Sequence, residues 1–131
     1  MLTLSNGQVT LALPDALEWV DEFGWSPVVS TRSYTTTGAL LVEEAIRQAG
    51  RPITLRGQVQ RTWMSRAQLK QVLAWSQVAG LVLTLVLRNV SRSVVFDHAD
   101  VAVEGVPVQF FSDSAVDDLD WYVPTFRFVE V

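Results

Sequence analysis

The segment from Tyr34 to Gln58 constrains the fold most strongly, because a sharp break divides two apolar runs within it. Gly50-Arg51-Pro52 forms this break. Glycine and proline this close together end regular structure and mark a turn. The two runs are therefore expected to be separate elements on either side of a change in chain direction.

The first run, Gly38–Ala49, fits two secondary structures. Its Ala, Leu, Glu, Ile, Arg and Gln residues favour a helix by intrinsic propensity. The same run also alternates with the period of a strand, and Thr35–Thr37 before it favours extended backbone. We favour the strand, because the turn leads into the alternating Ile53 and Leu55. This interpretation predicts a long hairpin at about residues 38–59, although the pattern alone leaves the helix open.

Two further elements are indicated by local signals. Asn6-Gly7 lies between alternating apolar residues, which favours a hairpin with a type I′ turn. Ser65 and Gln68 have the spacing of a capping box, which predicts a helix at about residues 66–79. Its expected inner stripe is Leu69, Val72, Leu73 and Ser76, with Trp75 beside it.

The second half of the chain reads mainly as strands. Leu81–Leu87 is apolar at nearly every position, which predicts a central strand covered on both faces. Gly105 and Pro107 interrupt the next apolar stretch, and Tyr122–Val131 predicts a closing strand. At 131 residues, the chain fits one domain spanning 1–131 that buries a core without disulfides.

Composition excludes several classes of protein. The chain has no cysteine, which removes disulfides, thiolate nucleophiles and cysteine-bound zinc. The first residues lack the pattern of a signal peptide, and Val78–Leu87 is too short to span a bilayer. We therefore expect cytosolic synthesis and no membrane partner. The net charge of −4 and the lack of a Lys/Arg run argue against sequence-specific nucleic-acid binding.

Charge is unevenly distributed along the chain. Residues 31–92 hold nine of the ten basic side chains, whereas both ends are acidic. All the basic residues except Lys70 are arginines, which suit carboxylate recognition at interfaces. The simpler interpretation is that the basic middle pairs with the acidic ends inside one fold. The alternative is that basic and acidic faces of neighbouring subunits meet.

His98 is the only candidate for acid–base catalysis by a histidine. Asp97 and Asp100 flank it, so it has the composition of a base oriented by a carboxylate. No nucleophile motif, phosphate-binding glycine loop or HExxH pattern accompanies it. A histidine in a turn is the simpler interpretation, and a small hydrolase ranks last among the possible functions. We therefore predict no enzyme, no catalytic residue and no cofactor.

The carboxylates of the loop Ser112–Asp120 raise the question of calcium, since four aspartates lie there. The spacing, central glycine and terminal glutamate of an EF-hand are absent. We predict a solvated acidic loop and no metal site. Five tryptophans suit either sugar stacking or packing and interface contacts, and packing is the simpler interpretation. They are Trp19, Trp25, Trp63, Trp75 and Trp121.

Three segments carry a resemblance to a known family. Gly38–Glu44 with Gln48–Leu55, and the closing Asp120–Val131, resemble small tail structural proteins of long-tailed bacteriophages and prophages. The order of elements extends the resemblance over almost the whole chain. It is most similar to the distal tail protein, the ring that joins the tail tube to the baseplate. Many such proteins carry an added C-terminal domain, often glycan-binding; because the closing strand is the last element of this sequence, we do not expect it to adhere to the host surface.

The resemblance implies a β-sandwich or split barrel with one packed helix, assembled as a homo-oligomeric, hexameric ring in the virion tail. It implies contacts with other tail proteins of the tube and baseplate hub. The expected contact residues are Glu43, Glu44, Arg47, Arg51, Arg56, Asp113, Asp117 and Asp118. Alternatives are a carbohydrate-binding β-sandwich module and another ring subunit of the tail tube or baseplate.

Overall fold

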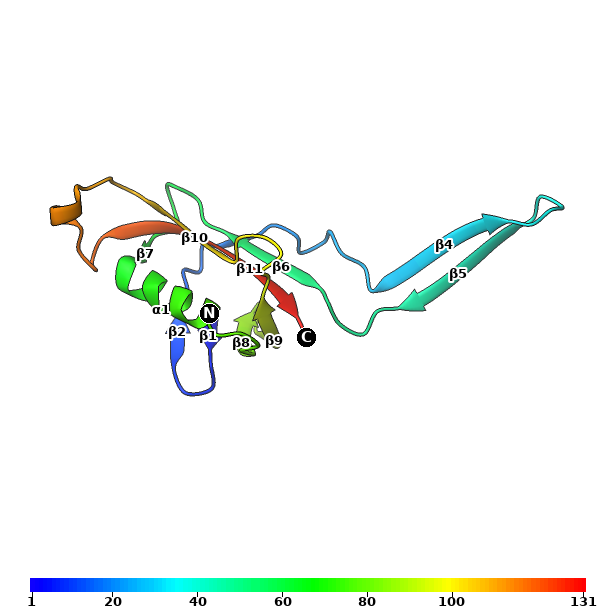
Figure 1. Cartoon of the computed structure of the whole chain (residues 1–131), viewed down its shortest axis with the longest axis horizontal. Coiled ribbons are helices and arrows are strands. Elements are labelled where there is room, and N and C mark those ends of the chain that lie inside the picture. The colour runs from blue at the N-terminus through cyan, green and yellow to red at the C-terminus, as the bar shows by residue number, and fades with distance from the viewer.

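The computed structural model describes residues 1–131 as a curled antiparallel sheet, a single α-helix and a projecting two-stranded arm (Figure 1). Strands make up 43% of the residues and helical turns 11%, which confirms the mainly β, sandwich-like fold with one helix. The arm consists of β4 (Val28–Tyr34) and β5 (Leu40–Ile46). The sheet contains β1 (Thr3–Ser5), β2 (Thr10–Ala12), β3 (Glu18–Trp19), β6 (Pro52–Arg56), β7 (Met64–Ser65), β8 (Leu83–Leu87), β9 (Val90–Phe96), β10 (Val103–Pro107) and β11 (Trp121–Glu130).

The closing strand β11 organises the sheet. The strand order is β2-β1-β8-β9-β11-β6-β3, with β7 and β10 also paired to β11. One edge of β11 pairs first with β7 and then with β6, and the other edge pairs with β10 and then with β9. This ten-residue strand therefore joins the two halves of the fold.

A single core lies on the inner face of the sheet. Strands from both ends of the sheet order contribute to it, including Leu4 of β1 and Trp19 of β3, so the sheet curls around this core. Buried side chains alternate along the strands, as one-sided burial requires. The most buried are Leu4, Ile53, Leu55, Met64, Val72, Leu83, Leu85, Val94, Phe126 and Phe128.

Strand β8 differs from the prediction of burial on both faces. Leu83, Leu85 and Leu87 point into the core, but Thr84 is exposed. The strand is central in its pairing, between β1 and β9, and one of its faces is open to solvent. The apolar run of β8 therefore reflects the central position of this strand in the sheet. It does not indicate a second layer that covers the other face.

The helix α1 (Arg66–Ser76) begins where the capping box predicts. The Ser65 hydroxyl accepts from the Gln68 amide at 3.4 Å. Val72 and Trp75 are buried, whereas Leu73 is exposed, so the buried stripe is rotated by about one residue from the predicted one. A short 3₁₀ turn, η1 (Asp113–Ala115), lies in the acidic loop.

The strand assignment for Gly38–Ala49 is confirmed, but the predicted hairpin at about residues 38–59 is wrong in its pairing. Strand β5 pairs with β4, from Val28–Ile46 to Tyr34–Leu40, and not with β6. The turn forms at Thr35–Ala39, where Gly38 has φ of +85° and the Thr35 hydroxyl accepts from the Ala39 amide. Strand β6 instead enters the core sheet between β11 and β3.

Candidate interaction surfaces

The β4–β5 arm is the most exposed part of the molecule. Every residue of both strands is exposed, and none belongs to the core. Figure 1 shows it projecting from the body along the longest axis. An isolated two-stranded hairpin is at best marginally stable in water. This surface is therefore of the kind that gains stability from a partner.

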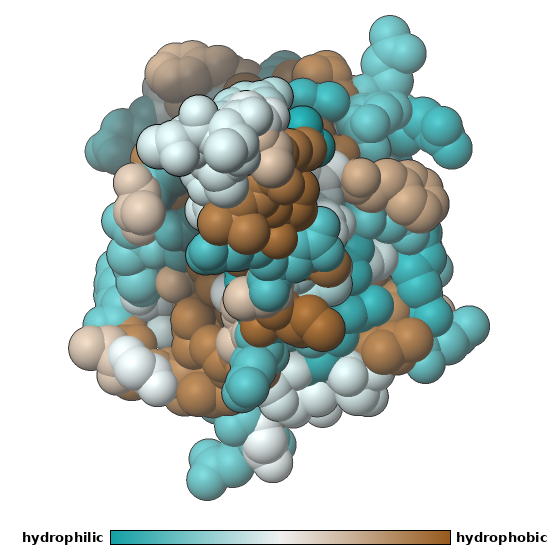
Figure 2. All heavy atoms as spheres, turned by 90° about the vertical axis from the view of Figure 1, so that its right-hand side faces the viewer, coloured by the Kyte–Doolittle hydropathy of each residue, from teal (hydrophilic) through white to brown (hydrophobic).

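One face of the arm carries five apolar residues, with Ser30, Arg32 and Glu44 among them. Directly opposed residues of an antiparallel pair share a face, and the pairing places five apolar residues together. Tyr34 at the tip is 76% exposed and Ile46 at the base 74%. Viewed from the arm end, hydrophobic residues are exposed among polar ones (Figure 2). The apolar members of this face are Val28, Tyr34, Leu40, Val42 and Ile46.

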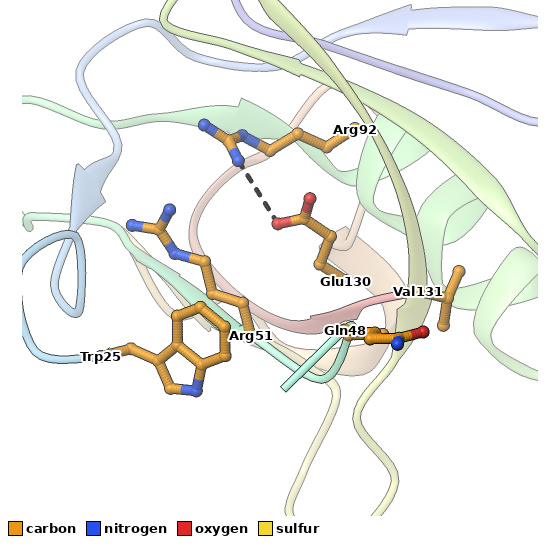
Figure 3. A pocket seen from close by; sticks show the side chains of 7 residues that line it. Trp25, Gln48, Arg51, Arg92, Glu130 and Val131 are labelled. Carbon is orange, nitrogen blue, oxygen red and sulfur yellow. Dashed lines mark hydrogen bonds and ion pairs between the residues drawn. The ribbon is translucent and has the colours of Figure 1, made fainter. Parts of the chain in front are cut away.

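A pocket of about 250 Å³ lies at the base of the arm. Trp25 and Gln48 come from the two connections that lead to and from the arm. Arg51 and Arg92 extend their guanidinium groups to the same side of the pocket, away from Val131 (Figure 3). Its seven lining residues are Trp25, Gln48, Ala49, Arg51, Arg92, Glu130 and Val131.

Three guanidinium groups converge on the buried indole of Trp19. The ring centroid lies 4.8 Å from the Arg51 guanidinium carbon, 5.3 Å from that of Arg92 and 5.9 Å from that of Arg88. Cations within about 6 Å of an indole face are attracted by its ring quadrupole. The Arg51 guanidinium also lies 6.0 Å from the Trp25 ring. Stacking thus fixes where these three charges lie.

Carboxylates neutralise only part of this cluster. Arg92 pairs with Glu130 at 3.3 Å, and Arg88 pairs with Glu22 at 3.3 Å. Arg51 forms no ion pair, and its Nη2 donates to the backbone carbonyl of Glu22. Nε of Arg51, Nε of Arg92 and Nε1 of the Trp19 ring are buried without a hydrogen-bond partner. The arrangement is therefore one carboxylate short of neutral.

A second surface lies at the opposite end of the molecule, beyond β7 and β10 (Figure 1). Trp63 and Trp121 face each other with ring centroids 6.5 Å apart, and both are about half exposed. They border an open groove with Val108, Phe111 and Leu119. We call this the aromatic groove. The acidic loop Ser112–Asp120 runs beside it.

Charge pairing within the chain agrees in part with the simpler interpretation of its distribution. Arg56, Arg66, Lys70, Arg88 and Arg92 all pair with acidic residues from the two ends of the chain. Four basic residues of the middle segment have no carboxylate partner. They are Arg32, Arg47, Arg51 and Arg61.

The structure places the predicted contact residues in three groups. Glu43 and Glu44 lie on opposite faces of the exposed strand β5, with Arg47 just beyond its end. Arg51 lies in the pocket at the base of the arm, and Arg56 pairs with Glu18 on the body. No contact joins these arginines to the acidic loop within one chain, since the loop lies at the far end (Figure 1).

The three predicted aspartates of the loop differ in their partners. Asp118 pairs with Lys70 at 3.1 Å and with Arg66 at 3.8 Å. Asp113 and Asp117 are exposed and have no cationic partner. Asp117 accepts from the Leu119 amide instead. No group of three or more side chains in the chain is arranged to hold a metal ion.

His98 lies in an exposed turn between β9 and β10. Asp97 accepts from the Ala99 amide, and Asp100 accepts from the Val101 amide and pairs with Arg127. Both carboxylates are thus engaged away from the imidazole. The nearest aromatic ring to His98 is that of Phe96, at 6.3 Å between centroids.

Sequence reasoning did not anticipate the convergence on Trp19. Arg88 lies in the two-residue turn between β8 and β9, Arg92 lies within β9, and Arg51 precedes β6. These residues are far apart in sequence, and no local pattern links them to Trp19. The only available signal was the abundance of arginine over lysine in the middle segment.

The structure contains no helix of the length and hydrophobicity needed to cross a membrane. Comparison with protein-family models, with characterised proteins and with solved structures finds no match for this chain.

Proposed function

We propose that the chain is a non-enzymatic structural subunit of a long-tailed phage tail, forming a homo-oligomeric ring of the distal tail type. The observation that carries this proposal is the arm. A ring subunit needs an extended surface that is complete only against its neighbour, and the β4–β5 hairpin is such a surface. The ring, expected to be a hexamer, would join the tail tube to the baseplate.

The physical argument rests on exposure. The five apolar residues of the arm face contribute nothing to the core of their own chain. Large exposed apolar patches mark interaction sites. Both outer edges of the hairpin also present unpaired backbone groups, which favour strand addition or close docking. Contacts between a projecting arm and a different surface of a neighbour are heterologous, and such contacts close into rings when the rotation allows.

The resemblance of Gly38–Glu44, Gln48–Leu55 and Asp120–Val131 to tail structural proteins supplies the specific biological setting. The first two segments build most of β5 and most of β6, and the third builds β11. These are the arm and the strand that organises the body. A subunit of another ring in the tube or baseplate would also need a surface that its neighbour completes. The assignment to the distal tail ring therefore rests on the resemblance.

The particle mass in solution tests this proposal. We expect the full chain to form a closed oligomer, detected by native mass spectrometry and sedimentation. In a matched variant, a short Gly-Ser link replaces residues 28–46. The ends of this link are close, because the Arg47 amide donates to the Pro27 carbonyl at 2.7 Å. We expect this variant to fold and remain monomeric. A full chain that stays monomeric at all concentrations and ionic strengths would contradict the proposal.

The alternative of a carbohydrate-binding module rests on the aromatic groove. Trp63 and Trp121 expose their rings, and exposed indoles stack on sugars. Saturable binding to a glycan array that is lost in Trp121→Ala, with the fold retained, would favour this function. Trp19 and Trp75 are buried and Trp25 is half-buried at the base of the arm, so the groove is the sole candidate surface among the tryptophans.

A further inference from the structure

We propose that the pocket at the base of the arm is a carboxylate-binding site, and that the acidic loop of a second copy of the chain fills it. This inference rests on the proposed function, because it names the two surfaces through which ring subunits meet. The ligand is an exposed aspartate side chain, Asp113 or Asp117.

Among the side chains of the pocket and its arginine cluster, one positive charge is unpaired. Arg88 and Arg92 each have a carboxylate within 3.3 Å, but Arg51 has only a backbone carbonyl. Arg51 Nε is buried without a hydrogen-bond partner, and a cation partly removed from water without a counter-charge raises the free energy of the free subunit. A carboxylate that reaches Arg51 forms charge-assisted hydrogen bonds, which are among the strongest in proteins. The site therefore favours an incoming anion.

Arg51 is positioned before any ligand arrives. Its guanidinium lies between the rings of Trp19 and Trp25, at 4.8 and 6.0 Å, and its Nη2 is anchored by the Glu22 carbonyl. Trp19 itself is only 7% exposed and cannot swing away. A side chain fixed in this way loses little conformational entropy on binding. Its other terminal nitrogen, Nη1, has no hydrogen-bond partner and is available to a carboxylate.

The size of the pocket indicates a side chain as its ligand. Sites for drug-sized molecules usually enclose about 300–1,000 Å³. This cavity of about 250 Å³ is smaller, and it opens beside the arm. Its volume suits a single carboxylate side chain presented by a larger partner.

The acidic loop has the matching charge. Asp113 and Asp117 are exposed and have no cationic partner in their own chain, unlike Asp118. The loop lies at one end of the longest axis and the pocket lies near its middle, at the base of the arm, so the loop does not reach the pocket of its own subunit (Figure 1). A second copy placed head to tail brings the two together.

Each of the two contact surfaces, the pocket and the acidic loop, has an apolar area next to its charged side chains. The pocket adjoins the apolar face of the arm, which begins at Val28 and Ile46. The acidic loop adjoins the aromatic groove, and Leu119 belongs to both. When the acidic loop of one subunit enters the pocket of a second subunit, the arm of the second subunit can lie along the aromatic groove of the first. Charge and apolar surfaces then match in a single head-to-tail contact.

Two neutralising variants of the full chain test this contact. Arg51→Ala removes the binding group of the pocket, and the double variant Asp113→Asn/Asp117→Asn removes the ligand. We expect each change to weaken self-association by about 10- to 100-fold, as loss of a charge-assisted hydrogen bond does. Arg61→Ala removes an exposed arginine that also lacks a carboxylate partner, and it is expected to assemble like the wild type.

Mixing the two variants identifies the geometry. The Arg51→Ala chain keeps its loop, and the loop variant keeps its pocket, so one intact contact forms between them. At a concentration where each variant alone is monomeric, we expect the mixture to form one-to-one dimers and nothing larger by native mass spectrometry. Far-UV circular dichroism checks that both are folded. If Arg51→Ala lowers the stability of the fold, the Asp113→Asn/Asp117→Asn variant still tests the contact. Its two substituted residues are exposed, so we expect this variant to fold.

The outcomes separate this inference from the proposed function. Wild-type oligomers that persist in both variants would overturn the inference and leave the ring intact. Loss of assembly in Arg51→Ala but not in the loop variant would mean that another anion fills the pocket, which also overturns it. A wild-type chain that never assembles would overturn the proposed function itself.

Discussion

Gly57 and Pro124 are in close backbone contact, because the Gly57 amide donates to the Pro124 carbonyl at 2.8 Å. A Cβ atom at residue 57 would lie 2.5 Å from the same carbonyl oxygen and 2.9 Å from the Val123 side chain. This contact holds the chain leaving β6 against the middle of β11. Backbone atoms cannot move aside as a flexible side chain can, so glycine is required here.

Gly57→Ala is therefore expected to lower the free energy of unfolding by about 1–3 kcal/mol, the usual effect of overpacking. Urea denaturation followed by tryptophan fluorescence measures it. Gly24→Ala is the matched control, because a Cβ there meets no atom closer than 3.9 Å. Equal effects of the two changes would contradict the role of the close contact.

Thr62→Val tests the single buried polar side chain of the chain. Thr62 is fully buried, and its hydroxyl donates to the Ala16 carbonyl at 3.1 Å. Valine has a similar shape but leaves that carbonyl without its donor. We expect a loss of about 1–3 kcal/mol in the free energy of unfolding. Thr36→Val on the exposed arm tip serves as the control. A change below about 0.5 kcal/mol at position 62 would be no larger than the usual effect of a surface substitution and would refute the prediction.

Ser65→Ala tests the start of the helix. The Ser65 hydroxyl accepts from the Gln68 amide, but the distance of 3.4 Å is long for such a bond. The expected loss is therefore at the lower end of the N-cap range, about 0.5 kcal/mol. Thermal unfolding followed at 222 nm measures it, with Ser114→Ala as an exposed control. A loss above about 2 kcal/mol would show that the serine does more than cap the helix.

Tyr34→Ser combined with Leu40→Ser tests the apolar face at the arm tip. These two residues are directly paired and exposed. We expect the stability of the monomer to change by less than about 0.5 kcal/mol, because neither side chain contacts the core. Self-association is expected to weaken about tenfold or more, as removal of an exposed aromatic anchor does. Sedimentation at several concentrations measures it, and unchanged association would show that the tip is not buried in the oligomer.

Local signals predicted the elements of the body well. The capping box at Ser65 located the helix, because the bond that begins a helix is made between residues three apart. Alternation of apolar residues located the strands, since burial on one face has a period of two. These features depend on near neighbours in the sequence.

Local signals failed to predict the pairing partner of β5, because a turn at Gly38 and a turn at Gly50 were equally compatible with the sequence. Gly38 and Gly50 both adopt positive φ, at +85° and +99°, so each can turn the chain. Strand β5 pairs across the turn at Gly38, because β6 is drawn into the core by Ile53 and Leu55. The Gly50 amide then binds the Glu130 carbonyl of the closing strand. Competition for the core decided the pairing.

The sequence by itself determined the mainly β composition and the position of the helix, and it favoured a strand at Gly38–Ala49 without excluding a helix there. Those properties follow from propensity, periodicity and capping, which act over a few residues. Only the tertiary structure decided that Tyr34–Gln58 splits, with its first run in a projecting arm and its second in the core. It also brought Arg51, Arg88 and Arg92 around Trp19. The physical reason is that burial and charge convergence depend on residues distant in sequence, which only the folded sheet brings together.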